Sequence, residues 1–324
     1  MSAFVKFSTL KLKPVYTYII VVLSMVFWGM SFVWSKIVLE FYDPITTVLL
    51  RLILSSVLIF SGLKMFYKIQ KIKKDDYILF AFSSLFNPFL YFIGENYGLQ
   101  LSSPTTTSVI IATIPVFTPI LAFIIYRERL SILNIAGLLL SFFGVLFMLV
   151  NRDLSFGASA KGVSWLSLAV LSAVLYSVLL KKLAMKYDAF RIIATQNLIG
   201  AIYFLPLFFV FDFRHFVTVT PSAGAIASLL LLAFFASSLA YVFFTISSRE
   251  IGISKTNLFT NLIPVFTTIF SFFILNEQFE GKKIAGMMIV IAGVLMSQIN
   301  QNSRFLRVTR VFRLNAGNQK SHVG

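Results

Sequence analysis

Ten apolar segments of about the length that crosses a bilayer dominate this chain of 324 residues. A helix needs ~20 mostly apolar residues to span the hydrocarbon core of a membrane. The composition agrees, because 58% of the residues are hydrophobic and only 12% are charged. We therefore expect an all-α integral membrane protein. The ten segments are residues 16–39, 45–66, 77–97, 104–126, 131–150, 162–187, 190–211, 223–247, 253–275 and 284–299.

The distribution of Lys and Arg predicts how these spans are oriented. With the N-terminus inside the cell, 21 basic residues fall on the inner side and 5 on the outer side, which leaves two within spans. Basic residues concentrate in cytoplasmic loops of membrane proteins. The bias therefore predicts a multi-pass protein of the cell membrane with both termini in the cytoplasm. It also accounts for the net charge of +16 without a nucleic-acid partner.

Several kinds of chemistry lack the residues that they need. The chain has no cysteine, and its two histidines, His215 and His322, are too few for a histidine metal cluster. It has no Walker A glycine run that would bind ATP. It also lacks the His-Glu-x-x-His and Gly-x-Ser-x-Gly motifs, and no pair of Asp residues lies within the predicted spans. We expect no cofactor and no catalytic residues, and an intramembrane enzyme is the remotest alternative.

An internal repeat divides the chain. Residues 114–146 align without a gap on residues 263–295, and 15 of the 33 positions are identical. Each copy holds five spans, and an odd number of spans forces the second copy to cross the membrane upside down. We therefore predict a cytoplasmic segment (1–15), a first repeat (16–150), a connecting loop (151–161), a second repeat (162–299) and a basic cytoplasmic tail (300–324).

Short motifs in both repeats resemble those of a known superfamily. Pro-Val-Phe-Thr, a later Glu and then Ala-Gly recur in 115–137 and 264–286. Trp28-Gly29, Phe32, Lys36, Pro44 and Arg51 stand in the first two spans. These features resemble the drug/metabolite transporter superfamily, and within it the EamA family. The second repeat departs from the opening motif. The resemblance implies transport of metabolites, commonly outward, along a route enclosed by spans one, three, four, six, eight and nine.

Polar stripes on the third and eighth spans are candidate cavity walls. Asn87, Tyr91 and Glu95 follow a spacing of four residues, which places them on one helix face. Ser237, Tyr241 and Thr245 repeat this spacing in the second copy. Such stripes avoid lipid, so they either bond neighbouring helices or line a cavity. Tyr91 and Tyr241 are the stronger candidates for the cavity.

Arg51 and Glu95 are charged residues inside the predicted hydrocarbon. Arg51 lies about 9 Å inside the second span at 1.5 Å per residue. A charge at this depth is costly and needs protein or water around it. The two residues either form a structural ion pair, or Glu95 couples transport to a proton.

Prolines interrupt the fourth and ninth spans. Pro115 and Pro119 in one, and Pro264 in the other, remove backbone donors at membrane depth and bend the helix. Such breaks are tolerated where they line a cavity, so these prolines are predicted helix-break or gating positions. The remaining candidates for binding solute in the cavity are polar or aromatic residues within the predicted spans, and Asn257 and Asn261 are four residues apart on the ninth span. These candidates are Trp28, Ser108, Tyr176, Asn257 and Asn261.

The sequence as a whole favours a secondary transporter that moves small metabolites by alternating access. The polar candidates suit neutral or zwitterionic solutes such as amino acids. The main alternative is a flippase for lipids or lipid-linked sugars, which a lateral opening between helices would favour. The expected partners are a small-molecule solute and membrane lipids. Glycines on the fifth and tenth spans, among them Gly137 and Gly293, either join those spans or meet a second protomer, so the chain is a monomer or a homodimer.

Overall fold

A computed structural model describes residues 14–66, 70–127, 131–149, 159–278 and 281–297. Almost all of these residues are helical, and none of them forms a strand. Most of the predicted N-terminal segment and connecting loop lies outside the described residues, as do the predicted tail and Glu128.

The first repeat contributes five apolar spans. The fourth begins with a proline at its first turn and with Ser103, whose side chain accepts a hydrogen bond from the backbone N–H of Thr106. The elements are α2 (Pro14–Val38), α3 (Pro44–Phe66), η1 (Lys74–Asp76), α4 (Tyr77–Ser84), η2 (Leu85–Leu90), α5 (Tyr91–Gln100), α6 (Pro104–Ile111), α7 (Ile114–Tyr126) and α8 (Ile132–Leu149).

The second repeat also contributes five apolar spans, with additional short elements. The elements are α9 (Ala160–Ala184), α10 (Ala189–Leu207), η3 (Phe208–Asp212), α11 (Phe213–Phe216), α12 (Ala223–Leu231), η4 (Leu232–Ala240), α13 (Tyr241–Ile251), α14 (Ile253–Leu258), η5 (Phe259–Leu262), α15 (Ile263–Leu275) and α16 (Gly281–Ser297).

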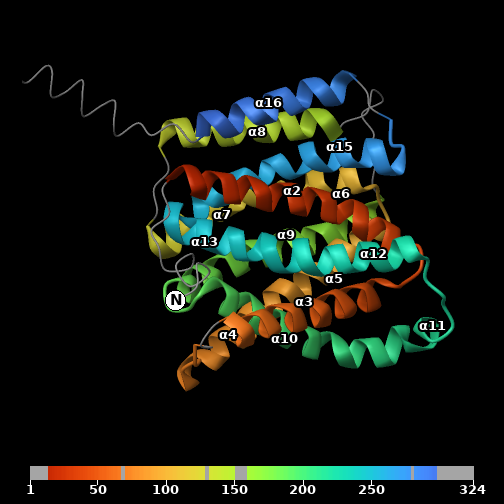
Figure 1. The fold of residues 1–324 in the computed structure, drawn as a ribbon. Helices are drawn as coiled ribbons and strands as arrows, with labels where there is room; N and C mark the ends of the chain where they lie inside the picture. Colours follow the sequence, from red (N-terminus) through yellow and green to blue (C-terminus); the bar gives the residue numbers. More distant parts are fainter. Residues whose placement is uncertain (1–13, 67–69, 128–130, 150–158, 279–280, 298–324) are drawn as a thin grey trace, which may run out of the picture.

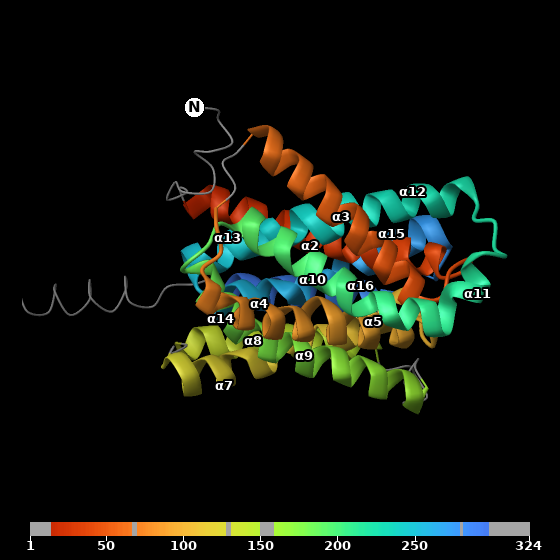
Figure 2. The ribbon, with the colours of Figure 1, turned by 90° about the horizontal axis from the view of Figure 1, so that it is seen from below.

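The prediction of an all-helical membrane fold with ten spans is confirmed. Among the described residues, eight helical stretches are long and apolar enough to cross a membrane, and α8 and α16 contain the two shorter apolar helices. The first spans of the two repeats, α2 and α9, run in opposite directions (Figure 2). The start of α2 and the end of α16 lie at the same end of the bundle (Figure 1).

Four spans are interrupted near their middle. The sequence analysis expected breaks in the fourth and ninth spans, and these occur between α6 and α7 and at the 3₁₀ turn η5. It expected continuous helices in the third and eighth spans, where the structure has the π-helical segments η2 and η4 instead. In η2 the backbone of Asn87 leaves the helical region, at φ −147° and ψ 118°, directly before Pro88. The broken spans lie around the centre of the molecule.

The two repeats interleave, because each major helix contact joins one helix of each repeat. The most extensive contact joins α8 and α16, which form one edge of the bundle (Figure 1). Other contacts join α5 to α9, α3 to α10 and α2 to α15. Seen from below, α3 and α12 lie at one edge, α7 and α9 lie at the other, and α4, α5 and α10 lie between (Figure 2).

Glycines allow the close approach of α8 and α16. A Cβ atom added at Gly144 would lie 2.8 Å from the backbone nitrogen of Val290, and one at Gly293 would lie 2.7 Å from the carbonyl oxygen of Gly137. Small residues of this kind let helix backbones meet directly in membranes. The sequence left two roles open for these glycines, contact between the fifth and tenth spans or contact with a second protomer. The structure shows the contact between the fifth and tenth spans.

Candidate functional site

A cavity of about 60 Å³ lies between the two repeats, at mid-depth of the bundle. Its wall comes from α2, α3 and α9, and from the interrupted spans that contain η2, η4 and η5 together with α6 and α7. The volume admits a few water molecules. Seven aromatic residues line the cavity: Trp28, Phe32, Tyr91, Phe92, Tyr176, Tyr241 and Phe244.

The third span contributes the stripe that the sequence predicted. Asn87, Tyr91 and Glu95 all line the cavity. The side-chain amide of Asn87 donates to the hydroxyl of Tyr241 across the cavity wall, at 3.3 Å. Glu95 is in hydrogen-bonding contact with Tyr91, four residues earlier on the same helix face. The break at Asn87 therefore directs an amide toward the second repeat.

The three residues of the matching stripe on the eighth span have different roles. Tyr241 lines the cavity, whereas Ser237 and Thr245 do not. The hydroxyl of Thr245 donates to the carbonyl of Tyr241 at 2.7 Å, within its own helix. Ser237 accepts a hydrogen bond from the Nε of Arg51 at 2.8 Å. Both alternatives that the sequence left open, bonding between helices and lining the cavity, are therefore present in one stripe.

Arg51 is 1% exposed and also lines the cavity. Its guanidinium carbon lies 4.3 Å from the centroid of the Phe92 ring, a cation–π contact. Among the described residues, no direct ion pair joins Arg51 to Glu95, although both reach the same cavity. The choice between a structural and a coupling role for Glu95 stays a prediction.

Trp28 fills the wall and stabilises the break in the eighth span. Its ring packs edge-on against Tyr241, with the ring centroids 4.9 Å apart, and its Nε1 donates to the carbonyl of Ala236 at 3.3 Å. A π-helical turn shifts the backbone hydrogen bonds and leaves such carbonyls free to accept from side chains. Asn197 supplies a second donor, to the carbonyl of Ser237 at 3.0 Å.

The ninth span holds two of the predicted candidates, and only one lines the cavity. Asn257 does so, and its side-chain nitrogen has no hydrogen-bond partner among the described residues. Asn261 is fully buried outside the lining, where its side-chain amide donates to Ser141 of α8. The equivalent residue of Asn257 in the first repeat, Ser108, is also outside the lining and donates to the carbonyl of Thr105 at 2.7 Å.

The predicted prolines flank the cavity without lining it. Pro115 and Pro264 occupy the first turn of α7 and of α15, and Pro119 lies inside α7. The residues that precede the first two, Ile114 and Ile263, do line the cavity. Pro115 and Pro264 therefore mark the start of a half-helix at the cavity wall, whereas Pro119 does not.

Several residues at equivalent positions of the two repeats line the cavity. Tyr176, which donates to Gln196 at 3.1 Å, stands 145 residues after Ser31, and both line the cavity. Phe32 and Ser177 share this offset, and Tyr91 and Tyr241 are related by an offset of 150. The sequence analysis missed Ser31, Phe32, Phe92, Ser177, Phe244 and Thr260. Extending the repeat alignment to the partner of Tyr176 would have found Ser31.

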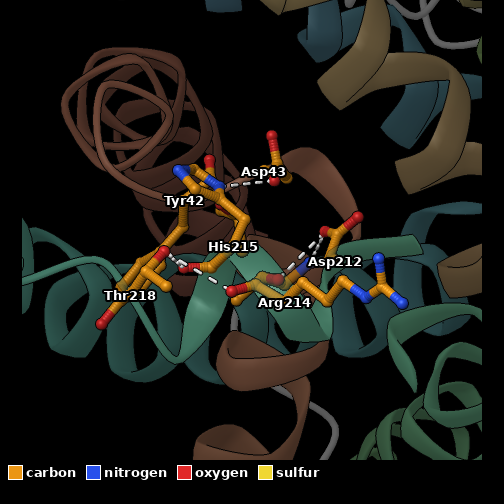
Figure 3. A network of polar contacts seen from close by, with 8 residues as sticks. Tyr42, Asp43, Asp212, Arg214, His215 and Thr218 are labelled. Carbon is orange, nitrogen blue, oxygen red and sulfur yellow. Dashed lines mark hydrogen bonds and ion pairs between the residues drawn. The ribbon is translucent and has the colours of Figure 1, made fainter. Parts of the chain in front are cut away.

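Separate polar networks hold the two ends of the bundle. At the end that carries α11, Nδ1 of His215 lies 2.6 Å from Oδ2 of Asp43, and Asp212 accepts from the backbone N–H of Thr46 at 2.8 Å (Figure 3). These contacts join the start of α3 to the end of the seventh span. The neighbouring rings of Tyr42 and Phe216 lie 5.7 Å apart.

At the opposite end, Asp76 binds two residues of the turn between α9 and α10. It accepts from the Nζ of Lys186 and from the hydroxyl of Tyr187, both at 2.6 Å. The hydrogen bond to Asp76 raises the pKa of Lys186. Both networks lie at the ends of spans, where they connect neighbouring helices. The charged residues that line the cavity are Arg51 and Glu95.

Comparisons with known proteins agree with this architecture. The model of the EamA-like transporter family matches residues 15–150 and 160–298. An uncharacterized transporter of Archaeoglobus fulgidus is 27% identical over 289 residues, which are 88% of this chain and 98% of the relative. The uncharacterized transporter YetK of Bacillus subtilis is 27% identical over 302 residues, which are 89% of this chain and 88% of the relative. A solved crystal structure with 16% identity superposes with a TM-score of 0.72 over 88% of this chain and 97% of the other.

Proposed function

Because the chain belongs to the EamA-like transporter family, we propose that it is a secondary transporter of small neutral or zwitterionic metabolites such as amino acids. One observation carries the proposal. A single cavity at mid-depth, between the repeats, combines aromatic rings with one cation, one carboxylate and several amides and hydroxyls. Small-molecule sites are mostly apolar with a few placed polar groups, and transporters with inverted repeats bind solute between the halves.

The mechanism that we propose is alternating access across the cytoplasmic membrane, with both termini inside. The broken third, fourth, eighth and ninth spans give each repeat helix halves that can tilt separately around the cavity. The α8–α16 contact joins the repeats away from the cavity wall. The repeats can therefore rock about the solute while that contact persists.

The test is counterflow in proteoliposomes that contain the purified protein. Labelled amino acids and other small metabolites are screened without a gradient, and then across a pH gradient. We expect accumulation of one solute class without any gradient. Accumulation of none, by protein shown to be folded, would contradict the proposal. A response to the pH gradient would identify a proton-coupled carrier and favour the coupling role of Glu95.

A matched pair of variants ties the transport to the cavity. Asn257→Leu replaces an amide in the wall with an apolar side chain, so we expect the initial rate of counterflow to fall at least tenfold. Ser108→Ala, at the equivalent position of the first repeat, lies outside the lining and should change the rate less than twofold. Equal effects of the two substitutions would remove Asn257 from the solute site.

A second candidate, a lipid flippase, is favoured by one feature. An apolar groove of about 610 Å³ lies between α6, α7, α8 and α9. Its wall includes the exposed residues Phe117, Ile120 and Leu171, so it opens to the side of the bundle. Movement of fluorescent phospholipid between leaflets of the same proteoliposomes, at a rate that depends on the protein, would support this function. Solute counterflow without lipid movement would reject it.

A further inference from the structure

Arg51 carries the most conspicuous unused donor in the cavity wall. The side chain is almost fully buried, and its Nη1 has no hydrogen-bond partner among the described residues. A buried charged donor without an acceptor is unfavourable, because it has lost water and gained no replacement. In the wall of a binding cavity, such a donor marks the position of an absent acceptor.

The rest of the guanidinium is held in place. Its Nε donates to Ser237 at 2.8 Å, and its plane lies over the ring of Phe92. Ser237 is itself fixed, because its carbonyl accepts from Asn197, whose amide also donates to Ser55 at 2.7 Å. These contacts orient the guanidinium before any ligand arrives. A planar, pre-oriented guanidinium matches the geometry of a carboxylate.

The carboxylate within the protein does not fill this role. Glu95 interacts electrostatically with Arg51 and is in hydrogen-bonding contact with Tyr91, but no direct ion pair to Arg51 is present in the described part of the chain. The other neighbours of the cavity are mainly aromatic rings and aliphatic side chains. An anionic group of the solute is therefore the chemistry that would complete the wall.

We propose that Arg51 is the anion-binding residue of the cavity and takes the carboxylate of the transported solute, whose apolar body lies against the aromatic rings. Ser237 is a positioning residue, which acts on the solute through Arg51. The inference rests on the proposed transport function and specifies the solute class. Two kinds of solute share this chemistry, an amino acid and a simple carboxylate, and the test separates them.

The experiment is competition for counterflow by the full-length protein in proteoliposomes, with two series of probes. One series is phenylalanine, 3-phenylpropionate and phenethylamine, and the other is leucine, 4-methylpentanoate and 3-methylbutylamine. Within each series the hydrocarbon part of the molecule stays the same. The second compound lacks the ammonium group, and the third lacks the carboxylate. We expect the amine to compete at least tenfold more weakly than its partners that keep the carboxylate. Competition by the amino acid alone would identify a zwitterion site, and equal competition by the simple carboxylate would identify a monocarboxylate site.

Variants connect that selectivity to Arg51. Arg51→Gln should raise the half-saturating concentration of carboxylate probes at least tenfold, and Arg51→Lys should restore part of the loss because it keeps the charge. Ser237→Ala leaves the cation in place and should cause a smaller rise, about threefold, with unchanged thermal stability. A merely structural role would lower stability in all three variants and leave the preference for carboxylates intact.

The outcomes separate the two proposals. Transport in which the amine competes as well as the carboxylates would overturn the inference and leave the transporter standing. The same conclusion follows if the wild-type protein transports only solutes without a carboxylate. Absence of counterflow for every class would remove the transport function and this inference together.

Discussion

The two repeats surround one cavity with similar backbones and different charges. Tyr91 and Tyr241 stand at equivalent positions and both line the wall. Both charged groups of the wall, Arg51 and Glu95, come from the first repeat, where the second has Gln196 and Thr245. Arg51 lies about 10 Å from the start of α3, and Glu95 about 8 Å from the end of α5, at 1.5 Å per residue. On the predicted orientation, both therefore lie in the outer half of the membrane.

This difference indicates how a symmetric frame binds an asymmetric solute. Inverted repeats give the protein two related conformations, which open to opposite sides. The charges do not follow that symmetry, so we expect a solute with a polar end and an apolar end to bind in one orientation. On the predicted orientation, Asn257 and Tyr176 lie toward the inner side of the cavity, where we expect these uncharged polar groups to face the other end of the solute.

The largest effect should come from removing the carboxylate of the first repeat. Glu95→Gln deletes a buried charge of the wall, and we expect at least a tenfold fall in the initial rate of counterflow. Thr245→Ala, at the equivalent position of the second repeat, removes a hydroxyl that bonds within its own helix, so the rate should change less than twofold. Protein recovery and monodispersity on size-exclusion chromatography control for folding. A loss of equal size in both variants would show that the charge difference between the repeats is unimportant.

An effect no larger than that of Glu95→Gln should distinguish the two equivalent tyrosines. Hydrogen bonds to charged groups contribute about 1.5–3 kcal/mol and neutral ones about 0.5–1.5 kcal/mol. Tyr91→Phe removes a contact with the carboxylate of Glu95, so transport should fall about tenfold or more. Tyr241→Phe removes an acceptor for the neutral amide of Asn87 and should reduce transport about twofold to tenfold. Rates measured side by side that rank in the opposite order would contradict this comparison.

The smallest effect on transport should arise where the repeats are alike. Gly144 and Gly293 occupy equivalent positions, and each faces the backbone of the partner helix. Alanine at either site forces α8 and α16 apart, and overpacking of this kind costs about 1–3 kcal/mol. We expect a lower Tm in detergent for both variants and little change in transport at low temperature. Gly62→Ala is the matched control, because its added Cβ would meet nothing within 4 Å.

The sequence predicted the spans and half of the cavity for definable reasons. Hydropathy marks spans because lipid penalises every exposed polar group. The spacing of four residues placed Tyr91 and Glu95 correctly, since α5 is a regular helix between them. Trp28 lay too deep for an interfacial position, and it lines the wall.

A spacing of four residues does not bring Asn261 to the cavity wall. Asn261 follows Asn257 by four residues, but the intervening chain passes through the 3₁₀ turn η5. A 3₁₀ turn advances three residues per turn, so the i+4 residue rotates away from the face that an α-helix would give it. Hydropathy also does not predict the π-helical turns η2 and η4, because they change the backbone hydrogen bonds without changing the composition.

The hydrogen bond between Arg51 and Ser237 also has a consequence for biogenesis. The two residues are 186 positions apart in the chain. At a synthesis rate of ~5–20 residues per second, Ser237 is synthesised roughly 10–40 s after Arg51. Helix α3 is therefore complete before the acceptor of its cation exists, and inserting that cation costs about 2.5–3.5 kcal/mol on insertion scales, which the Leu and Ile residues of α3 offset. The ring of Phe92 in the first repeat can contact the guanidinium earlier, but the hydrogen bond to Ser237 forms only when the second half of the nascent chain folds onto the first.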